Sequence, residues 1–278
     1  MKPCVDLHLH THYSDGTTSP ADLLEIVRSK GLSAFAVTDH DTMDGYWAVR
    51  SMLRPTDPEL VVGLELSVTV DGGDLHLLGY LFDPENMALI TALAEFRLRR
   101  NQRARLMVQR LNDMGIEVSF EDVQQVAGEA PVGRPHVADA LVSRGAVRSY
   151  DEAFEKYIRN GGPAYVAKKN FTPEDALNLL HDAGGVAMLA HPVIDDRERH
   201  LEMLVGMGLD GVEAYHPVHR QSDVERLKHA ADRYRLLVTG GSDFHGRSSR
   251  YGLVGSQNVP VKHLDEIKLR AAQRRGMI

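Results

Sequence analysis

Residues 4–10 have the sequence Cys-Val-Asp-Leu-His-Leu-His, in which apolar and polar side chains alternate. This alternation predicts a β-strand over residues 4–9. Successive side chains of a strand point to opposite faces, so His8 and His10 share one face with Asp6. A His-x-His pair alone is more often incidental than a metal site. Its meaning therefore depends on what the rest of the chain places beside it.

Short apolar runs recur along the chain and predict further strands. They cover residues 34–37, 60–66, 75–81, 161–166, 186–190, 211–215 and 236–239. Between the first two strands, Ser19-Pro20 and Gly31 mark the start and the end of a helix. A β-α-β order of this kind favours parallel strands joined by helical crossovers. We therefore expect an α/β fold, with a barrel favoured over an open sheet.

One segment, residues 87–168, departs from this order. It begins with a long helical pattern over residues 87–114, and two shorter helical patterns follow. We expect a discontinuous catalytic domain, residues 1–86 and 169–278, that is interrupted by a helical insertion domain at 87–168. The arginines between residues 97 and 110 have helical spacing and are expected to form a solvated face.

Composition narrows the class of protein. The 278 residues carry a formal net charge of −7, with 43% hydrophobic and 26% charged residues, which is ordinary for a globular protein. The acidic balance argues against a stable complex with long nucleic acid. A single cysteine, Cys4, forms no internal disulfide, and no apolar run reaches 18 residues. We expect a cytoplasmic protein with no membrane partner.

Ionisable side chains lie at or near the ends of the predicted strands. Besides the first pair of histidines, they are Asp15, His40, Glu65, His76, His191, Asp243 and His245. Gathered without a cation, the carboxylates would repel one another and the imidazoles would lose solvation. Divalent cations remove both costs, and the carboxyl ends of barrel strands converge on one mouth. The set therefore predicts a metal centre.

Five short motifs also carry a resemblance to a known family. They are Asp6-Leu7-His8-Leu9-His10-Thr11, Ser14-Asp15-Gly16, Thr38-Asp39-His40-Asp41, Ala190-His191-Pro192 and Ser242-Asp243-Phe244-His245. In this order they resemble the motifs of the PHP family, which is named for its polymerase and histidinol phosphatase members. The resemblance extends over residues 1–85 and 170–260. It implies a distorted seven-fold β/α barrel with a metal-dependent phosphoesterase site.

The resemblance further implies three divalent metal ions with nine protein ligands. One ion would be held by His8, His10 and Asp243, a second by His76 and His191, and a third by Asp15, His40 and His245. Glu65 would bridge the first two ions. Imidazole and carboxylate ligands suit Mn²⁺, the ion we favour, and also Fe²⁺ or Zn²⁺. Asp6, Asp39 and Asp41 would orient the ligating imidazoles.

The activity implied by the resemblance is hydrolysis of a phosphate ester, with the metals activating water and neutralising phosphoryl charge. Residues expected in catalysis are Asp243, His191, Glu65 and His216. The insertion resembles a subgroup that removes the 3′-phosphate of 3′,5′-nucleoside bisphosphates and trims short RNA from its 5′ end. Residues expected to contact this small nucleotide substrate are Arg134, His136, Lys169, His219 and Arg247.

Two alternatives stay open at this stage. One is a histidinol-phosphate phosphatase, which would use the same metals on another ester. The other is a non-catalytic module that binds metals for structure alone, beside a polymerase. The complete ligand set and the absence of a polymerase sequence in the 278 residues favour an enzyme.

Overall fold

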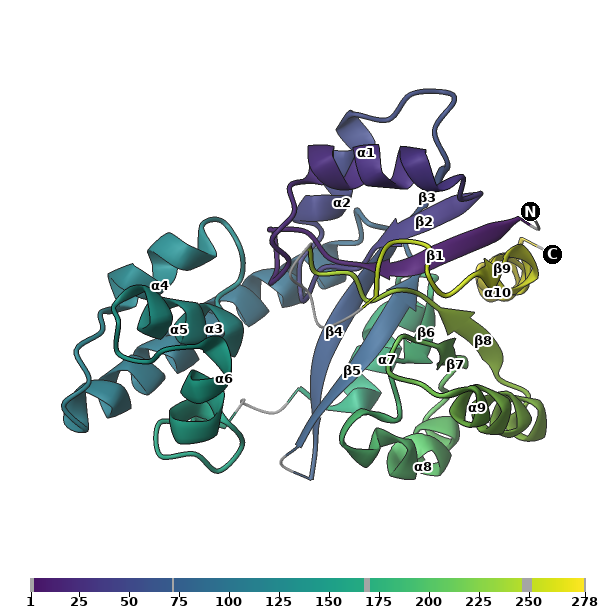
Figure 1. Ribbon diagram of the computed structural model, residues 1–278. Helices are drawn as coiled ribbons and strands as arrows, with labels where there is room; N and C mark the ends of the chain where they lie inside the picture. The colour runs from purple at the N-terminus through teal and green to yellow at the C-terminus, as the bar shows by residue number, and fades with distance from the viewer. Residues whose placement is uncertain (1–2, 72, 168–170, 247–251, 278) are drawn as a thin grey trace.

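The computed structural model describes residues 3–71, 73–167, 171–246 and 252–277. Its strands form two sheets, which lie beside each other in Figure 1. The first sheet has the strand order β3-β2-β1-β9. Its strands are β1 (Cys4–Leu9), β2 (Ala34–Val37), β3 (Glu59–Val61) and β9 (Val259–Pro260). The pairs β1–β2 and β2–β3 are parallel, as expected, and β9 runs antiparallel to β1.

The second sheet has five strands in chain order, from β4 to β8. They are β4 (Gly63–Val70), β5 (Gly73–Tyr80), β6 (Val186–Leu189), β7 (Gly211–Tyr215) and β8 (Leu237–Gly240). The last three are parallel, but β5 is antiparallel to both of its neighbours. The expectation of parallel strands is wrong for β4 and β5, because so short a connection allows only a hairpin.

The two sheets join at the ends of β1 and β2. Isolated β-bridges connect Leu9 with Phe244 and His40 with Glu65. The amide of His10 donates to the Phe244 carbonyl at 2.9 Å, which fixes the first of these contacts. The result is a mixed α/β fold of two joined sheets, rather than a uniform ring of seven parallel strands. The places where the two sheets join bring three predicted metal ligands together: His10, His40 and Glu65.

The run at residues 60–66, expected as one strand, is divided between the two sheets. Its first part belongs to β3 and its second to β4, and the carbonyl of Val62 between them accepts from Leu81 at 2.9 Å. At Gly63 a side chain would lie 3.0 Å from Thr38 and 3.2 Å from Ala36. Glycine therefore lets the chain leave the first sheet while it stays pressed against β2.

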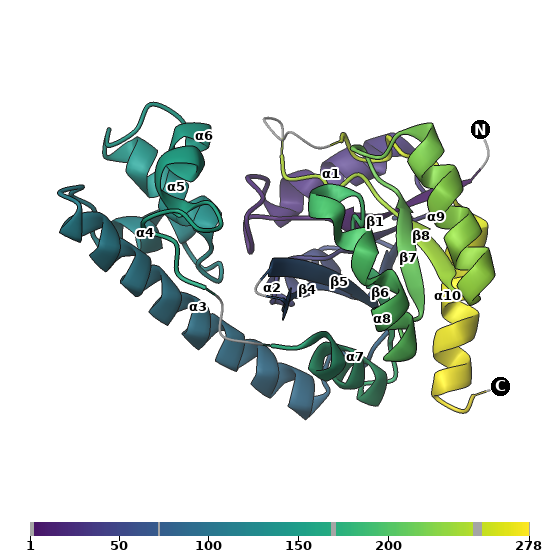
Figure 2. The ribbon, with the colours of Figure 1, turned by 90° about the horizontal axis from the view of Figure 1, so that it is seen from below.

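Helices cover both sheets (Figures 1 and 2). They are α1 (Pro20–Lys30), α2 (Asp44–Ser51), α7 (Pro173–Asp182), α8 (Leu201–Gly206), α9 (Gln221–Tyr234) and α10 (Val261–Arg274), with a 3₁₀-helix, η2 (Ile194–His200). In α1 the Ser19 hydroxyl accepts from the Asp22 amide, and Gly31 ends the helix at φ 66°. The start and the end predicted for this helix are thus confirmed.

A group of helices extends away from the sheets along α3, as Figure 2 shows. Its members are α3 (Met87–Asp113), α4 (Phe120–Ala127), α5 (Arg134–Ser143), α6 (Tyr150–Ala153) and a π-helix, η1 (Phe154–Ile158). The second half of α3 packs with the others around an apolar cluster of its own, from Ala104 to Ala164. The first half contributes Leu89 and Phe96 to the core under the second sheet. A single helix therefore belongs to two cores.

The strand expected at residues 161–166 is not formed. Gly161 adopts φ 75°, and the amides of Gly162 and Tyr165 donate to carbonyls three residues earlier. These local turns use the backbone groups that a sheet would need. The expectation failed because the two glycines and the proline beside the apolar residues favour turns.

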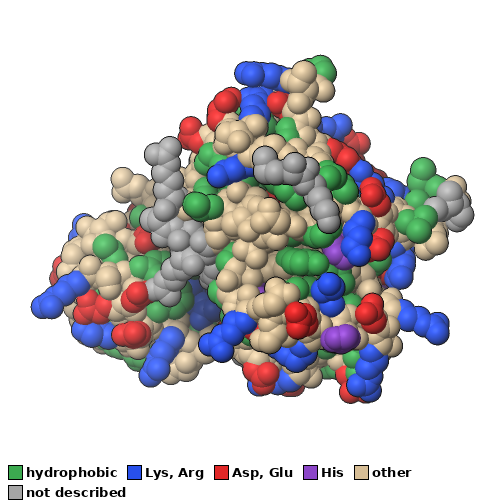
Figure 3. Space-filling model, turned by 45° about the vertical axis from the view of Figure 1, so that its right-hand side comes forward, with side chains coloured by type: hydrophobic (Ala, Val, Ile, Leu, Met, Phe, Trp, Pro, Cys, Tyr) green, Lys and Arg blue, Asp and Glu red, His purple; other side chains and the backbone are tan. Residues whose placement is uncertain are grey.

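Charged side chains of both signs are interspersed on the face shown in Figure 3. This distribution agrees with the modest net charge of −7. Among the described residues, no helix combines the length and the apolar composition needed to cross a bilayer.

Asp210 connects several elements at the base of the second sheet. Its carboxylate accepts from the Ala187 amide and from Arg274, each at 2.9 Å, and lies 2.9 Å from His181 Nε2. Burial raises the pKa of Asp210, but the hydrogen bonds from His181 and Arg274 outweigh it and lower the pKa to about 2. The ionised carboxylate therefore stabilises the fold.

We expect Asp210→Asn to lower the free energy of unfolding of the metal-free protein by about 2 kcal/mol at pH 6. A carboxyl with a lowered pKa contributes stability above its unfolded pKa and loses it as the pH falls through the folded pKa. The difference between variant and wild type should therefore shrink as the pH falls from about 4 to 2. Denaturant unfolding at a series of pH values measures it, and a difference that is constant with pH would contradict the assignment.

Candidate metal centre

The nine predicted ligands converge on one cleft of about 860 Å³. Seven of them line it: Asp15, His40, Glu65, His76, His191, Asp243 and His245. The other two, His8 and His10, are fully buried. Strand alternation on β1 points both imidazoles to the side where the two sheets join. The structure thus brings together residues that are up to 237 positions apart in the chain, from His8 to His245.

Glu65 lies at the centre of this cluster and is buried. Its Oε2 atom is 3.2 Å from His8 Nε2, 3.3 Å from His10 Nε2 and 3.2 Å from His40 Nδ1. Its Oε1 atom is 2.9 Å from His76 Nδ1 and 3.0 Å from His191 Nε2. One carboxylate therefore contacts five imidazoles, with one oxygen directed to each side of the cluster.

The other two carboxylates extend the cluster. Asp243 Oδ1 lies 3.2 Å from the Nε2 atoms of both His8 and His10. Asp15 Oδ1 lies 3.3 Å from His245 Nε2. The His245 ring stacks on His10 with the ring centroids 4.1 Å apart. All nine side chains thus form one contiguous group.

The protonation states of this cluster are strongly perturbed. Burial lowers the pKa of His10, but the neighbouring carboxylates of Asp243 and Glu65 outweigh it and raise the pKa to about 10. Burial, with Arg197 nearby, lowers the pKa of His191 to about 4. Burial raises the pKa of Glu65, yet the surrounding imidazoles bring it well below its usual range. His191 as a neutral imidazole and Glu65 as an ionised carboxylate are in the states that bind a cation, whereas a cation at His10 would displace the proton of that imidazole.

Donor geometry and unsatisfied atoms both fit divalent cations. Among the buried polar atoms that make no well-aligned hydrogen bond in the described part of the chain, four belong to the cluster: His10 Nε2, His40 Nδ1, His76 Nδ1 and Asp15 Oδ1. Buried polar atoms are rarely left so, and all four face the cluster. Donors bonded to one cation at about 2.0–2.1 Å lie roughly 3.3 Å apart, close to the spacings around Glu65 and Asp243. Imidazole and carboxylate donors suit Mn²⁺, Fe²⁺ or Zn²⁺.

Within the described ranges of the chain, four groups of side chains place their donor atoms within 4.8 Å of one another. They are His8, His10 and Asp243; His10, Asp15, His40 and His245; His8, Glu65 and His191; and His40, Glu65 and His76. The first two contain the residues expected around two of the ions. The pair expected for another ion, His76 and His191, falls in the last two groups, and both imidazoles lie within 3.0 Å of the same Glu65 oxygen, Oε1.

Comparison with known proteins identifies the family. The family model described as PHP domain matches residues 6–163. A 3′,5′-nucleoside bisphosphate phosphatase from Chromobacterium violaceum is 32% identical over 247 residues, which cover 87% of each chain. The chain belongs to the PHP family. The resemblance of the motifs is thus confirmed, and the match also includes the helical segment between the two halves of the motif set.

Other relatives of this PHP chain agree. A phosphoribosyl 1,2-cyclic phosphate 1,2-diphosphodiesterase from Eggerthella lenta is 32% identical, over 90% of this chain and 97% of the relative. The 5′-3′ exoribonuclease Rnm of Escherichia coli is 31% identical, over 86% and 84%. A solved structure from Bifidobacterium adolescentis, assigned as a metal-dependent phosphoesterase, superimposes with a TM-score of 0.86 at 31% identity and covers 97% of this chain and 98% of its own. The chain is an enzyme that hydrolyses phosphate esters.

Among the contacts of the described residues, the three aspartates expected to orient imidazoles in the PHP site make none directly to an imidazole, and Asp39 reaches His10 only through Ser14, whose hydroxyl lies 3.3 Å from His10 Nδ1. Asp39 accepts from the Thr11 amide at 2.7 Å and from the Ser14 hydroxyl at 2.6 Å. Asp6 accepts from the amides of Ser242 and Gly255, at 2.9 and 2.7 Å. These contacts fix the segments that carry Asp15 and Asp243. The third aspartate, Asp41, pairs with an arginine of α3.

A buried carboxylate that sequence reasoning missed, Glu213 on β7, supports two of the histidines. Its Oε1 lies 2.8 Å from His8 Nδ1, and its Oε2 accepts from the His191 amide at 2.7 Å. The second contact holds His191 at φ 28°, a conformation that costs free energy and is found at functional sites. The sequence feature that could have pointed to Glu213 is that it is a single acidic residue inside the apolar run 211–215.

Arginines also line the cleft, beside the carboxylates Asp74, Asp139, Asp151 and Glu155. These arginines are Arg100, Arg103, Arg134 and Arg197. The expectation of a solvated arginine face on α3 is wrong for Arg100 and Arg103, since Arg100 turns toward Asp41 and Ser67 and Arg103 toward Val166. Arg100 Nε donates to Asp41 at 2.8 Å, and Arg134 Nη2 donates to Asp74 at 2.7 Å.

The remaining predicted residues have other surroundings. His216 is fully buried, with Nε2 3.1 Å from Asp243 Oδ2, so it contacts the cluster from behind. His136 accepts from the Gly133 amide at 3.0 Å, and His219 Nδ1 donates to the Ala214 carbonyl at 2.9 Å; neither lines the cleft. Lys169 and Arg247 lie outside the described residues.

We expect a divalent cation such as Mn²⁺ to raise the melting temperature of the chelator-treated protein. At 100 times its Kd a ligand stabilises the folded state by about 2.7 kcal/mol, which is roughly 5 °C or more for a chain of this size. Thermal unfolding with and without the cation measures the effect. The exposed His12→Ala variant should respond like the wild type, and the same increase in Glu65→Gln would contradict the assignment.

We expect Glu213→Gln to weaken Mn²⁺ binding by about 10- to 100-fold, as is typical when a carboxylate behind a ligating imidazole is lost. The amide keeps the size of the side chain but removes the charge beside His8 Nδ1 and so lowers the basicity of that imidazole. Competition with a chelator of known affinity provides the measurement. Unchanged affinity would show that Glu213 serves only the backbone.

Proposed function

We propose that this chain removes the 3′-phosphate of 3′,5′-nucleoside bisphosphates, such as adenosine 3′,5′-bisphosphate, and releases the 5′-mononucleotide and phosphate. The observation that carries the proposal is one cleft with two kinds of wall. The donor cluster around Glu65 lines one part of the cleft, and the arginines Arg100, Arg103, Arg134 and Arg197 line another part together with the carboxylates Asp74, Asp139, Asp151 and Glu155. A substrate with two phosphates can use both. The bisphosphate phosphatase relative, at 32% identity, supports the same substrate class.

The cations we propose are three divalent ions, with Mn²⁺ favoured and Fe²⁺ or Zn²⁺ as alternatives. His8, His10, Glu65 and Asp243 would hold the first, and Glu65, His76 and His191 the second. Asp15, His40 and His245 would hold the third. Bound there, the cations lower the pKa of water and neutralise charge on a phosphoryl group.

The chain's own residues supply position and charge. Asp243 and Glu65 keep the imidazoles directed at the cluster, and His216 contacts Asp243 from the buried side. Because His216 lies behind a ligand, we assign it a positioning role rather than contact with the substrate. Arg197 Nη1 lies 2.6 Å from His191 Nδ1 at the edge of the cleft, where a guanidinium can bind phosphoryl oxygens.

The fold suits a small substrate. The two joined sheets correspond, in this proposal, to the distorted seven-fold barrel of the family, and residues 87–168 to an insertion domain that covers its mouth. A cleft of about 860 Å³ has the size of a site for a nucleotide or the 5′ end of a short RNA. The exoribonuclease relative, at 31% identity, supports trimming of short oligoribonucleotides as a second use of the same site.

A screen of substrates with Mn²⁺ tests the function. We expect the wild type to release phosphate from adenosine 3′,5′-bisphosphate with a higher kcat/KM than from histidinol phosphate. The screen should include phosphoribosyl 1,2-cyclic phosphate and a short 5′-phosphorylated oligoribonucleotide. Preference for histidinol phosphate or for the cyclic phosphate would replace the proposed substrate, and failure to hydrolyse any of them would indicate a structural role for the metals.

Asp243→Ala and His191→Ala should lower kcat for the bisphosphate by more than the roughly 100-fold expected for residues that only support a ligand. The reason is that each side chain contributes a donor atom to the cluster. Circular dichroism of both variants should match the wild type, and His12→Ala is the activity control. Wild-type turnover in either variant, or in the chelated enzyme, would contradict the mechanism.

A further inference from the structure

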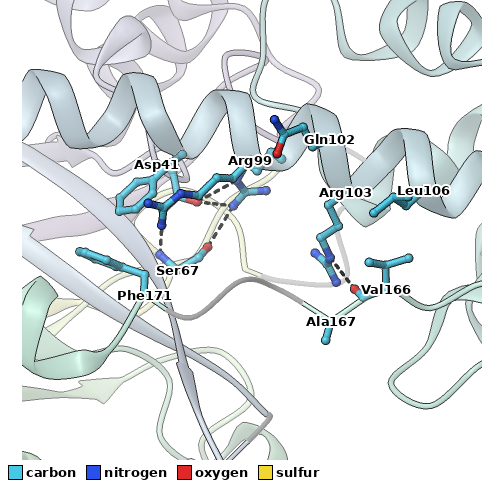
Figure 4. A pocket seen from close by; sticks show the side chains of 11 residues that line it. Asp41, Ser67, Arg99, Gln102, Arg103, Leu106, Val166, Ala167 and Phe171 are labelled. Carbon is cyan, nitrogen blue, oxygen red and sulfur yellow. Dashed lines mark hydrogen bonds and ion pairs between the residues drawn. The ribbon is translucent and has the colours of Figure 1, made fainter.

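Arg103 lies where the metal cleft meets a second cavity. This smaller hollow, of about 230 Å³, lies between α3 and β4 and is closed by Val166, Ala167 and Phe171 (Figure 4). Arg103 and Arg100 line both the hollow and the cleft. The Arg103 side chain leaves α3 toward Val166 and reaches the region between the two cavities.

The four arginines of the cleft differ in their partners. Arg100 is paired with Asp41, and Arg134 with Asp74. Arg197 lies 3.6 Å from Asp195, besides its contact with a metal-site imidazole. Within the described part of the chain, no carboxylate lies within ion-pair distance of Arg103.

The contacts that Arg103 does make leave part of its guanidinium unsatisfied. Nε donates to the Val166 carbonyl at 2.6 Å, and the guanidinium lies over the Tyr165 ring at 5.5 Å. Nη2 is buried and has no hydrogen-bond partner. If Arg103 served only to hold α3 against the segment around Val166, its contacts with Val166 and Tyr165 would be sufficient. The free donor indicates that a further acceptor belongs beside it.

The electrostatic surroundings of Arg103 also favour an anion. Arg103 is only 9% exposed, so its charge is largely removed from water. Burial and the nearby Arg134 lower the pKa of Arg103 to about 10 although Asp74 acts in the opposite direction, and the side chain stays charged at neutral pH. A buried charge without an ion-pair partner is unfavourable, and an anionic ligand reduces that cost.

We propose that Arg103 binds the substrate phosphate that is not hydrolysed. This assignment rests on the proposed function, in which the other phosphate lies at the metal cluster of the same cleft. A guanidinium offers two parallel donors that match a phosphate, which a buried and partly unpaired arginine can supply. Arg134, expected for this role from the sequence, already donates to Asp74 and to Asn160.

The test compares substrates that differ only in the second phosphate. For Arg103→Gln we expect kcat/KM for adenosine 3′,5′-bisphosphate to fall about 30-fold or more, mainly through KM, as expected for loss of a charge-assisted bidentate contact. For adenosine 3′-monophosphate it should change less than about threefold, because the scissile ester is the same. Arg105→Gln is the matched control, since Arg105 is an exposed arginine of α3 that lies over Phe120.

Arg103→Lys separates recognition from folding. It keeps the charge, so it should retain part of the preference for the bisphosphate, while a purely structural role would be disturbed alike by both variants. Melting temperatures of both variants accompany the kinetics. Equal losses on the two substrates in Arg103→Gln, or a loss of the same size in Arg105→Gln, would overturn the assignment.

Binding of adenosine 5′-monophosphate, the expected product, decides the role of Arg103 without turnover. Calorimetry with the Mn²⁺-loaded wild type should give an affinity that Arg103→Gln lowers about 30-fold and Arg105→Gln leaves unchanged. Equal affinity in all three proteins would overturn the phosphate contact. If the wild type hydrolyses no bisphosphate but Arg103→Gln still weakens this binding, the proposed function fails and the phosphate site stands.

Discussion

The rest of the structure depends on one buried carboxylate, Glu65, which lies within 3.3 Å of five imidazoles. A protein interior does not tolerate so many titratable groups unless each charge is compensated. Two features of the fold place Glu65 at the centre of these imidazoles. The chain changes sheets between Val62 and Gly63, and the bridge between His40 and Glu65 then fixes the start of β4 against the end of β2.

Much of the site could be predicted because strand geometry is simple. Alternation placed His8 and His10 on one face, and strand ends located His40, His191 and Asp243 without any knowledge of their neighbours. The partition of the ligands among three ions stays a prediction, because it depends on rotamers and on which oxygen of Glu65 faces which ring. Glu213 was missed because one acidic residue in an apolar strand has many explanations until its partner across the sheet is known.

The errors in the fold have a similar origin in long-range contacts. Residues 60–66 have the composition of one strand, and only the close approach of Gly63 to β2 divides them. Residues 161–166 have apolar side chains but no neighbouring strand to pair with. Helical periodicity correctly predicted α3, but it could not show which elements pack against each face of the helix. Arg100 and Arg103 were therefore predicted to be exposed to solvent. Local patterns predict elements, and tertiary packing decides their surroundings.

The membership of α3 in two cores has an evolutionary consequence. The helix is continuous over Met87–Asp113, with Phe96 in the core of the sheets and Met107 in the helical cluster. One inserted residue would turn everything beyond it by about 100° and slide it by about 1.5 Å, so neither core would keep its partner. Length variation among descendants of this sequence should therefore accumulate in the connections between the later helices, while α3 keeps its residue count.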